Sequence, residues 1–266
     1  MLQAVKTINW KAFFLLWLGG LLGVVSALPY LFDLLGRGVI GQAAVPEFPL
    51  STLVLLTLLQ NGVLLAIVIL IGMILSKRIG LRMPLVQACT TGERLPELKS
   101  VLSPSLGVGI FVGVVLVAVD VFVFLRHLPE AMHPFFQTPL WKRLPAGILY
   151  GGITEELLMR LFLLSLVAWL LSRWWRTSNG LPTDGVFWAA IFVAAILFGL
   201  GHLPATSAIV PLTLGLIVRA LLMNGVAGIA FGYLYWKHGL EAAMVGHMAA
   251  HLVIQIPGMI LVRGML

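Results

Sequence analysis

Seven apolar stretches, each about twenty residues or longer, follow one another along the sequence and make up most of its 266 residues. A helix needs about 20 residues to cross the apolar core of a bilayer. Only 10% of the residues are charged, whereas a soluble domain has about 25%. A soluble fold of this size also has too little interior to bury so much apolar surface. We therefore expect an all-α, polytopic transmembrane helical bundle that forms one membrane domain over residues 1–266.

The expected helices cover seven ranges, namely 13–32, 50–75, 106–125, 144–171, 185–203, 211–236 and 240–262. The sixth range would be either one long helix or a broken pair, so the bundle would have seven helices or eight. A polar segment over residues 76–100 separates the second and third helices. The segment 126–143, which is rich in Pro and aromatic residues, is expected to lie at the membrane interface rather than to span the bilayer.

The basic residues lie mostly between the apolar stretches. If the N-terminus is cytoplasmic, the cytoplasmic segments hold ten Lys and Arg and the opposite side holds five. This bias follows the positive-inside rule, so we expect an integral protein of a bacterial-type inner membrane with a cytoplasmic N-terminus. The formal net charge of +7 then reflects topology and contact with anionic lipid, and we expect membrane lipids but no nucleic acid as partners.

Three charged residues interrupt the fourth expected helix. A charge at the bilayer centre costs about 2.5–3.5 kcal/mol on insertion scales, so Glu155, Glu156 and Arg160 need an explanation. Glu156 and Arg160 are four residues apart and can pair on one helix face. Glu155 is rotated by about 100° from that face, which leaves it free to face a cavity as a general base. The alternative is an ion pair that only fixes this helix to its neighbours.

Three histidines lie in the fifth and seventh expected helices. His247 and His251 are four residues apart, so their rings lie on one face, where they could bind a metal or donate to one substrate atom. His202 follows Phe198 by four residues near the end of the fifth helix, where a packed core histidine is the simpler interpretation. Because neighbouring helices run in opposite directions, Glu155, His247 and His251 can meet near mid-membrane, while His202 is expected closer to one edge.

Four motifs occur in order over residues 145–255. Glu155-Glu-Leu-Leu-Met-Arg160 resembles the EExxxR motif of the CPBP family, which contains the type II CAAX prenyl endopeptidases and bacteriocin-processing or immunity proteins. Phe198-Gly-Leu-Gly-His202 is similar to the family's FxxxH motif, and the stretch 228–239 resembles its glycine-rich helix end. His247-Met-Ala-Ala-His251 resembles the last motif, HxxxN, with His251 in place of the more usual Asn.

The resemblance implies an intramembrane peptidase, of the glutamate type or metal-dependent, with its catalytic core over residues 145–255. In the family, the first Glu and the second-motif His are thought to activate water, and the last two polar residues are thought to stabilise the oxyanion. These roles would fall to Glu155 and His202, and to His247 and His251. The substrate would be a peptide or protein, with or without a lipid modification. A third His adds the option of Zn²⁺ held by His202, His247 and His251.

Two alternatives stay open on the sequence. A non-enzymatic membrane scaffold or bacteriocin-immunity protein would keep the motifs for structure alone. An ion-coupled transporter would use Glu155 and Asp120 as a relay. Asp120 would otherwise pair with Arg219, line the cavity or have no role beyond packing. The absence of an evident internal repeat weighs against a transporter.

Overall fold

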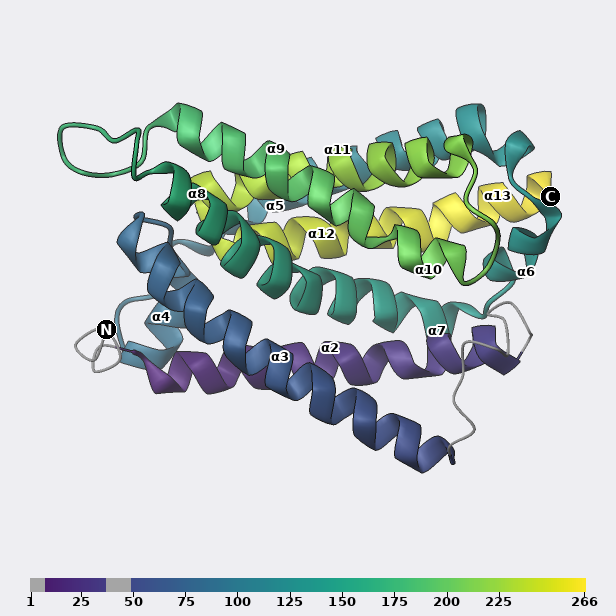
Figure 1. The fold of residues 1–266 in the computed structure, drawn as a ribbon, viewed down its shortest axis with the longest axis horizontal. Coiled ribbons are helices and arrows are strands. Elements are labelled where there is room, and N and C mark those ends of the chain that lie inside the picture. Colours follow the sequence, from purple (N-terminus) through teal and green to yellow (C-terminus); the bar gives the residue numbers. More distant parts are fainter. Residues whose placement is uncertain (1–7, 37–48) are drawn as a thin grey trace.

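The computed structural model describes residues 8–36 and 49–266, and within these ranges it contains helices and no β-strand. Lys6 and Arg37, which entered the charge comparison, lie outside the described residues. Long helices run roughly antiparallel to one another across the length of the bundle (Figure 1). The elements in chain order are α2 (Trp10–Gly36), α3 (Leu50–Arg78), α4 (Pro84–Thr91), α5 (Leu98–Val119), η2 (Asp120–Phe124), η3 (Leu125–His127), η4 (Glu130–Met132), α6 (His133–Phe136), α7 (Leu140–Pro145), η5 (Ala146–Glu155), η6 (Leu157–Leu164), α8 (Ser165–Leu171), α9 (Asp184–Gly201), α10 (Leu203–Ser207), α11 (Leu214–His238), α12 (Leu240–Val253), η7 (Ile254–Gly258) and α13 (Met259–Met265).

The expected all-helical membrane bundle is confirmed. Six helices in the described residues are long and apolar enough to cross a bilayer. A seventh long helical stretch runs from α7 through η5 and η6 to α8, and it carries the three charges of the first motif. The stretch predicted at 211–236 is one unbroken helix, and it begins at Leu214 because the Thr213 hydroxyl accepts a hydrogen bond from the Leu216 N–H at 3.3 Å. The short helix α4 lies inside the segment predicted only as polar.

Small residues let the neighbouring helices approach the charged helix closely. The Thr154 hydroxyl donates a hydrogen bond to the Gly20 carbonyl on α2 at 2.8 Å. A Cβ added to Gly72 on α3 would lie only 2.7 Å from the Leu161 carbonyl oxygen. On α11, a Cβ at Gly228 would lie 2.8 Å from Ala195, whereas one at Gly225 would meet nothing. Small residues at such crossings are typical of membrane helices.

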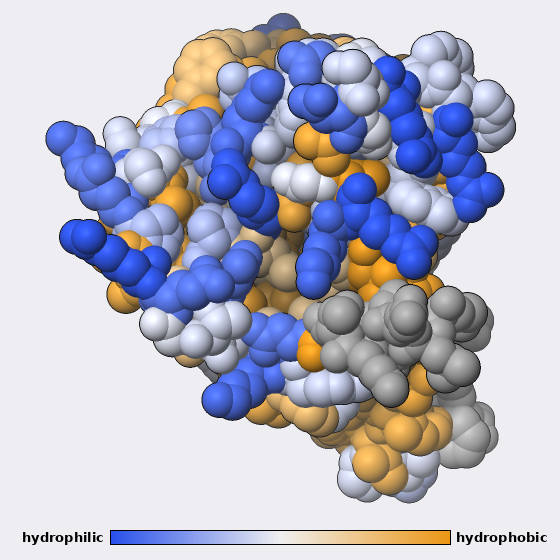
Figure 2. Space-filling model, turned by 90° about the vertical axis from the view of Figure 1, so that its left-hand side faces the viewer, coloured by the Kyte–Doolittle hydropathy of each residue, from blue (hydrophilic) through white to orange (hydrophobic). Residues whose placement is uncertain are grey.

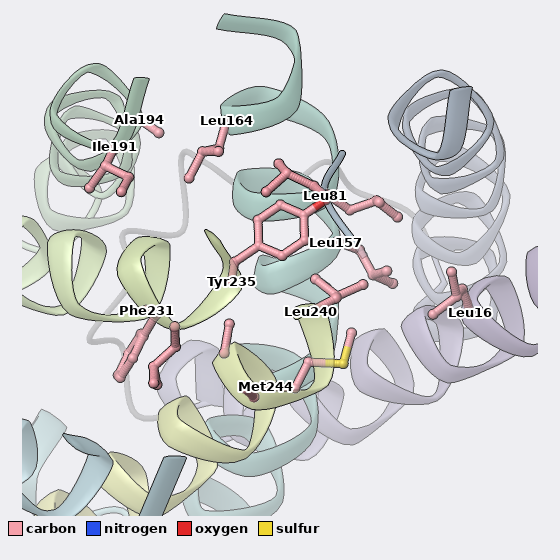
Figure 3. Close-up of a cluster of buried hydrophobic side chains, with 14 of the residues drawn as sticks. Leu16, Leu81, Leu157, Leu164, Ile191, Ala194, Phe231, Tyr235, Leu240 and Met244 are labelled. Atoms are coloured by element: carbon pink, nitrogen blue, oxygen red, sulfur yellow. The ribbon is translucent and has the colours of Figure 1, made fainter. Parts of the chain in front are cut away.

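The apolar core surrounds the same helix and includes buried residues of α2, α3, α9, α11 and α12. Figure 3 shows Tyr235 on α11 extending toward Leu157 and Leu81, with Leu164 and Ile191 in the same cluster of buried side chains. Tyr235 is fully buried, and its hydroxyl forms a 3.1 Å hydrogen bond with the Ser165 hydroxyl. Apolar packing and backbone contacts therefore fix the position of the charged helix on several sides, without any contribution from its ionisable residues.

The two ends of the bundle differ in charge. The end where α2 begins, called the basic end here, holds nine Lys and Arg among the described residues: Lys11, Lys77, Arg78, Arg82, Arg94, Lys99, Arg173, Arg176 and Lys237. The opposite end holds four such residues: Arg126, Lys142, Arg143 and Arg263. Figure 2 views the basic end directly and shows many hydrophilic side chains on it.

Candidate active site

The first motif lies on helical turns that are wider than those of an α-helix. Over η5 and η6 the backbone forms i→i+5 hydrogen bonds, and such π-helical turns often occur at functional sites. The 100° rotation assumed for an α-helix therefore does not describe the relation between Glu155 and Glu156. Both carboxylates instead reach the same imidazole, that of His247 on α12.

Glu156, Arg160 and the Nδ1 atom of His247 form the fully buried side of the site, which is called the closed side here. The Oε1 atom of Glu156 accepts a hydrogen bond from His247 Nδ1 at 2.7 Å and lies 3.1 Å from Arg160 Nη1. All three residues are buried, with exposed fractions of 0% for Glu156, 2% for Arg160 and 5% for His247. The predicted pairing of Glu156 with Arg160 is confirmed, and the bond to His247 is a feature that the sequence analysis missed.

Aromatic rings and backbone carbonyls complete the surroundings of Arg160. Its guanidinium carbon lies 5.2 Å from the centre of the Phe198 ring and 5.6 Å from that of Phe231. Its Nη2 atom lies 3.4 Å from the carbonyl oxygens of Ala227 and Gly228. A buried guanidinium needs such partners in addition to one carboxylate. Phe231 also stacks on His247, with ring centroids 4.7 Å apart.

Glu155, His202 and the Nε2 atom of His247 form the partly exposed side of the site, which is called the open side here. The Oε1 atom of Glu155 is 4.0 Å from His202 Nε2, and its Oε2 atom is 3.9 Å from His247 Nε2. The side chain of Glu155 is 17% exposed and that of His202 is 37% exposed. His202 is thus brought to Glu155 although the sequence placed it nearer one edge. It is the residue at which α9 ends and α10 begins, and its carbonyl accepts a hydrogen bond from the Thr206 N–H.

Hydrogen bonds fix which nitrogen of each ring faces Glu155. His202 Nδ1 lies 2.8 Å from the Phe198 carbonyl oxygen, which can only accept, so Nδ1 carries the proton. In the neutral ring, Nε2 then presents a lone pair toward Glu155. His247 Nδ1 bonds to a Glu156 carboxylate in the same manner, which leaves Nε2 of His247 toward Glu155. Separations of about 4 Å between polar atoms suit one bridging water better than a direct hydrogen bond.

His251 stacks on His247 and occupies a notch in η5. The two rings are nearly parallel, with centroids 5.0 Å apart and planes 14° apart. A Cβ at Gly147 would lie 2.6 Å from His251 Nδ1, and one at Gly151 would lie 2.8 Å from His251 Nε2. These two glycines therefore make the space for both imidazoles. The sequence analysis missed them, although their four-residue spacing just before the first motif was a signal.

The three histidines are a poor geometric fit to a shared metal ion. Imidazole lone pairs lie in the ring plane, so the parallel rings of His247 and His251 do not direct a nitrogen each toward one point. Among residues 8–36 and 49–266, no group of three His, Cys, Asp or Glu side chains has an arrangement that could hold a metal ion. Binding of Zn²⁺ by His202, His247 and His251 stays a prediction.

Asp120 does not contribute to this site. It forms a bidentate ion pair with Arg219, with N–O distances of 2.7 and 2.8 Å. The pair joins η2 to α11. Of the roles left open by the sequence, pairing with Arg219 is the one observed, and a relay through Asp120 would first have to break two charge-assisted hydrogen bonds.

Comparison with known proteins supports the resemblance of the motifs. Residues 137–253 match the family model described as type II CAAX prenyl endopeptidase Rce1-like. No curated protein and no solved structure matches the chain. The matched segment spans a little under half of the chain and contains every residue of the closed and open sides of the site. Through this segment the chain is similar to the Rce1-like type II CAAX prenyl endopeptidases.

Proposed function

We propose that this protein is an intramembrane endopeptidase in which Glu155 and His202 activate a water molecule. The observation that carries the proposal is the open side of the site, where Glu155 Oε1 faces the free Nε2 of His202 at 4.0 Å. Both atoms are hydrogen-bond acceptors when Glu155 is ionised and His202 is neutral. A water between them can donate one hydrogen to each and keep an oxygen lone pair for attack.

The chemical steps follow from this arrangement. The water oxygen attacks the scissile carbonyl carbon while its proton passes to the Glu155 carboxylate. The oxyanion that forms accepts a hydrogen bond from His247 Nε2–H, and the Glu156 carboxylate, bonded to Nδ1 of the same ring, holds that ring in place. The C–N bond then breaks as Glu155 returns the proton to the leaving amine, which yields a carboxylic acid and an amine. Arg160 holds Glu156 in place and does not touch the substrate.

Glu155→Gln tests the proposal directly. The amide is nearly the same size but cannot take a proton from water, so cleavage should fall by about 100- to 10,000-fold, the usual contribution of a general base. The substrate probe is an internally quenched peptide with a C-terminal CAAX sequence, offered to protein in lipid nanodiscs with and without a prenyl group on its Cys. The two forms of the probe also show whether a lipid-modified substrate is preferred.

The matched control is Glu130→Gln, which changes the same chemical group at an exposed position outside the site. This variant should cleave at the wild-type rate. A Glu155→Gln protein that is folded and cleaves normally would contradict the assignment and favour a scaffold or immunity role. Proton-dependent uptake by proteoliposomes that is lost in the same variant would favour a transporter.

We also propose that the basic end faces the cytoplasm of a bacterial-type inner membrane. The support is the excess of nine basic residues over four among the described residues. Labelling by a membrane-impermeant thiol reagent tests it, with Cys89, the single cysteine, in α4 near this end. Cys89 is exposed, so it should react only when the cytoplasmic side is accessible. Labelling of Cys89 in intact spheroplasts would show that the basic end faces away from the cytoplasm.

A further inference from the structure

A second hollow lies at the basic end, away from the site residues. It is a cavity of about 710 Å³ between the start of α2, the end of α3 and α4. None of Glu155, Glu156, Arg160, His202, His247 or His251 lines it. Figure 2 shows a hollow in this face with hydrophobic residues at its floor and hydrophilic residues around it. Ligand pockets commonly have volumes of about 300–1,000 Å³.

The charge around this cavity has a single sign. Lys77, Arg78 and Arg82 line it, and among the residues that the structure describes no Asp or Glu does. Glu241 on α12, a helix that packs against α4, is buried and accepts a hydrogen bond from the Val86 N–H at 2.7 Å. That carboxylate caps α4 and is not among the residues that line the cavity. Three cations without a carboxylate indicate an anionic ligand.

The floor of the cavity is apolar. Ala12, Met73, Leu81 and Met83 line it alongside the basic residues. The cavity lies where α2 begins and α3 ends, which is the level of lipid headgroups for helices that span a bilayer. A ligand that suits both parts has an anionic head and an apolar body.

The walls are held in place by hydrogen bonds to other parts of the bundle. The Leu240 N–H donates to the Arg82 carbonyl at 3.1 Å, and the Asn9 side chain donates to the Thr90 hydroxyl at 2.7 Å. Together with the Glu241 cap, these bonds fix α4 against α2 and α12. The cavity is thus formed without a ligand, which lowers the cost of binding.

We infer that this cavity is a binding site for an anionic phospholipid. The phosphate is held by Lys77, Arg78 and Arg82, and the glycerol and upper acyl carbons lie on the apolar floor. Basic pockets at a membrane surface bind lipid phosphates in this way. The site is independent of the proposed peptidase chemistry.

Native mass spectrometry of the full-length protein tests the inference. The detergent-solubilised protein is titrated with dioleoyl phosphatidylglycerol or dioleoyl phosphatidylcholine, and the bound lipid is counted. Phosphatidylglycerol should be retained in preference to phosphatidylcholine. The double variant Lys77→Gln/Arg82→Gln should weaken phosphatidylglycerol binding by about tenfold or more. Thr91→Trp fills the cavity from its exposed rim without changing the charge, and it should weaken binding as well.

The matched control is Arg94→Gln/Lys99→Gln, which removes the same charge from exposed positions at the same end but outside the cavity. It should bind phosphatidylglycerol like the wild type. Equal weakening in both double variants would show diffuse attraction to the surface and overturn the inference. Full binding by Thr91→Trp, or displacement of the lipid by an equal concentration of glycerol 3-phosphate, would also overturn it.

Discussion

Glu155 and Glu156 are adjacent in the sequence but have opposite surroundings. Glu156 is fully buried and is bonded at 2.7 Å to one imidazole and paired at 3.1 Å with a guanidinium. Glu155 keeps part of its surface and faces two imidazole nitrogens at 3.9 and 4.0 Å. The charges of the closed side are paired and buried, whereas the polar atoms of the open side are partly exposed and about 4 Å apart. Under the proposed function, one dipeptide therefore supplies both a structural ion pair and a catalytic carboxylate.

The strongest test of the open side concerns the joint action of its two groups. His202→Gln should reduce cleavage by about 100- to 10,000-fold, because the attacking water loses the hydrogen bond to Nε2 that orients it toward Glu155. If Glu155 and His202 activate one water, the double variant Glu155→Gln/His202→Gln should be little worse than either single variant. Single-turnover rates in nanodiscs provide the measurement. If the reduction in the double variant equals the product of the two single reductions, the two residues act in separate steps.

The closed side should respond in stability as well as in activity. Glu156→Gln leaves the buried guanidinium of Arg160 without its anion, and breaking such a pair costs about 3–5 kcal/mol. The free energy of unfolding, measured by denaturant titration in mixed micelles, should fall by that amount. Glu155→Gln is the matched control and should unfold like the wild type. Equal stability of the two variants would remove the distinction between the sides.

The notch in η5 tests whether the position of both imidazoles matters. A Cβ at Gly151 would lie 2.8 Å from His251 Nε2 and 3.3 Å from His247 Nε2, so Gly151→Ala has to displace the rings. We expect about 1–3 kcal/mol of lost stability, as for other overpacked cores, together with slower cleavage. Gly225→Ala, where the added methyl group meets nothing, should change neither quantity. Normal cleavage by Gly151→Ala would show that the rings can shift without consequence.

His251 should give the smallest effect. His251→Asn restores the residue more usual in the family and keeps a side-chain donor, so at most about one hydrogen bond, or about 1 kcal/mol, is lost. Cleavage should remain within about tenfold of the wild-type rate. A much larger loss would mean that the imidazole itself, stacked on His247, is required.

The sequence predicted the helices and the pairing of Glu156 with Arg160 for a clear physical reason. Apolar stretches that are long enough to span a bilayer predict helices. Charged residues inside such stretches are costly in lipid, so an ion pair is one of the few arrangements that explain them. The convergence of Glu155 with His202 and His247 was expected from the motifs, and the geometry of the described residues agrees with it.

Other features depended on backbone geometry that the sequence pattern does not reveal. The π-helical turns bring Glu155 and Glu156 to one imidazole, which an α-helical periodicity does not predict. The parallel stacking of His251 on His247 depends on the depth of the Gly147–Gly151 notch, so spacing alone could not distinguish stacking from convergence on a metal. The helix α4 depends on a cap from Glu241, which is 155 residues away from Val86 in the chain.

The position of His202 at the junction of α9 and α10 has a mechanical consequence. Its ring is attached where one helix stops and another begins, while Glu155 is attached to η5, which packs against α2 and α12. A small tilt of α10 would widen or narrow the space around the attacking oxygen without disturbing Arg160, Glu156 or His247. Substrate entry and reactivity would then depend on the junction of α9 and α10, while the positions of the buried charges would not change.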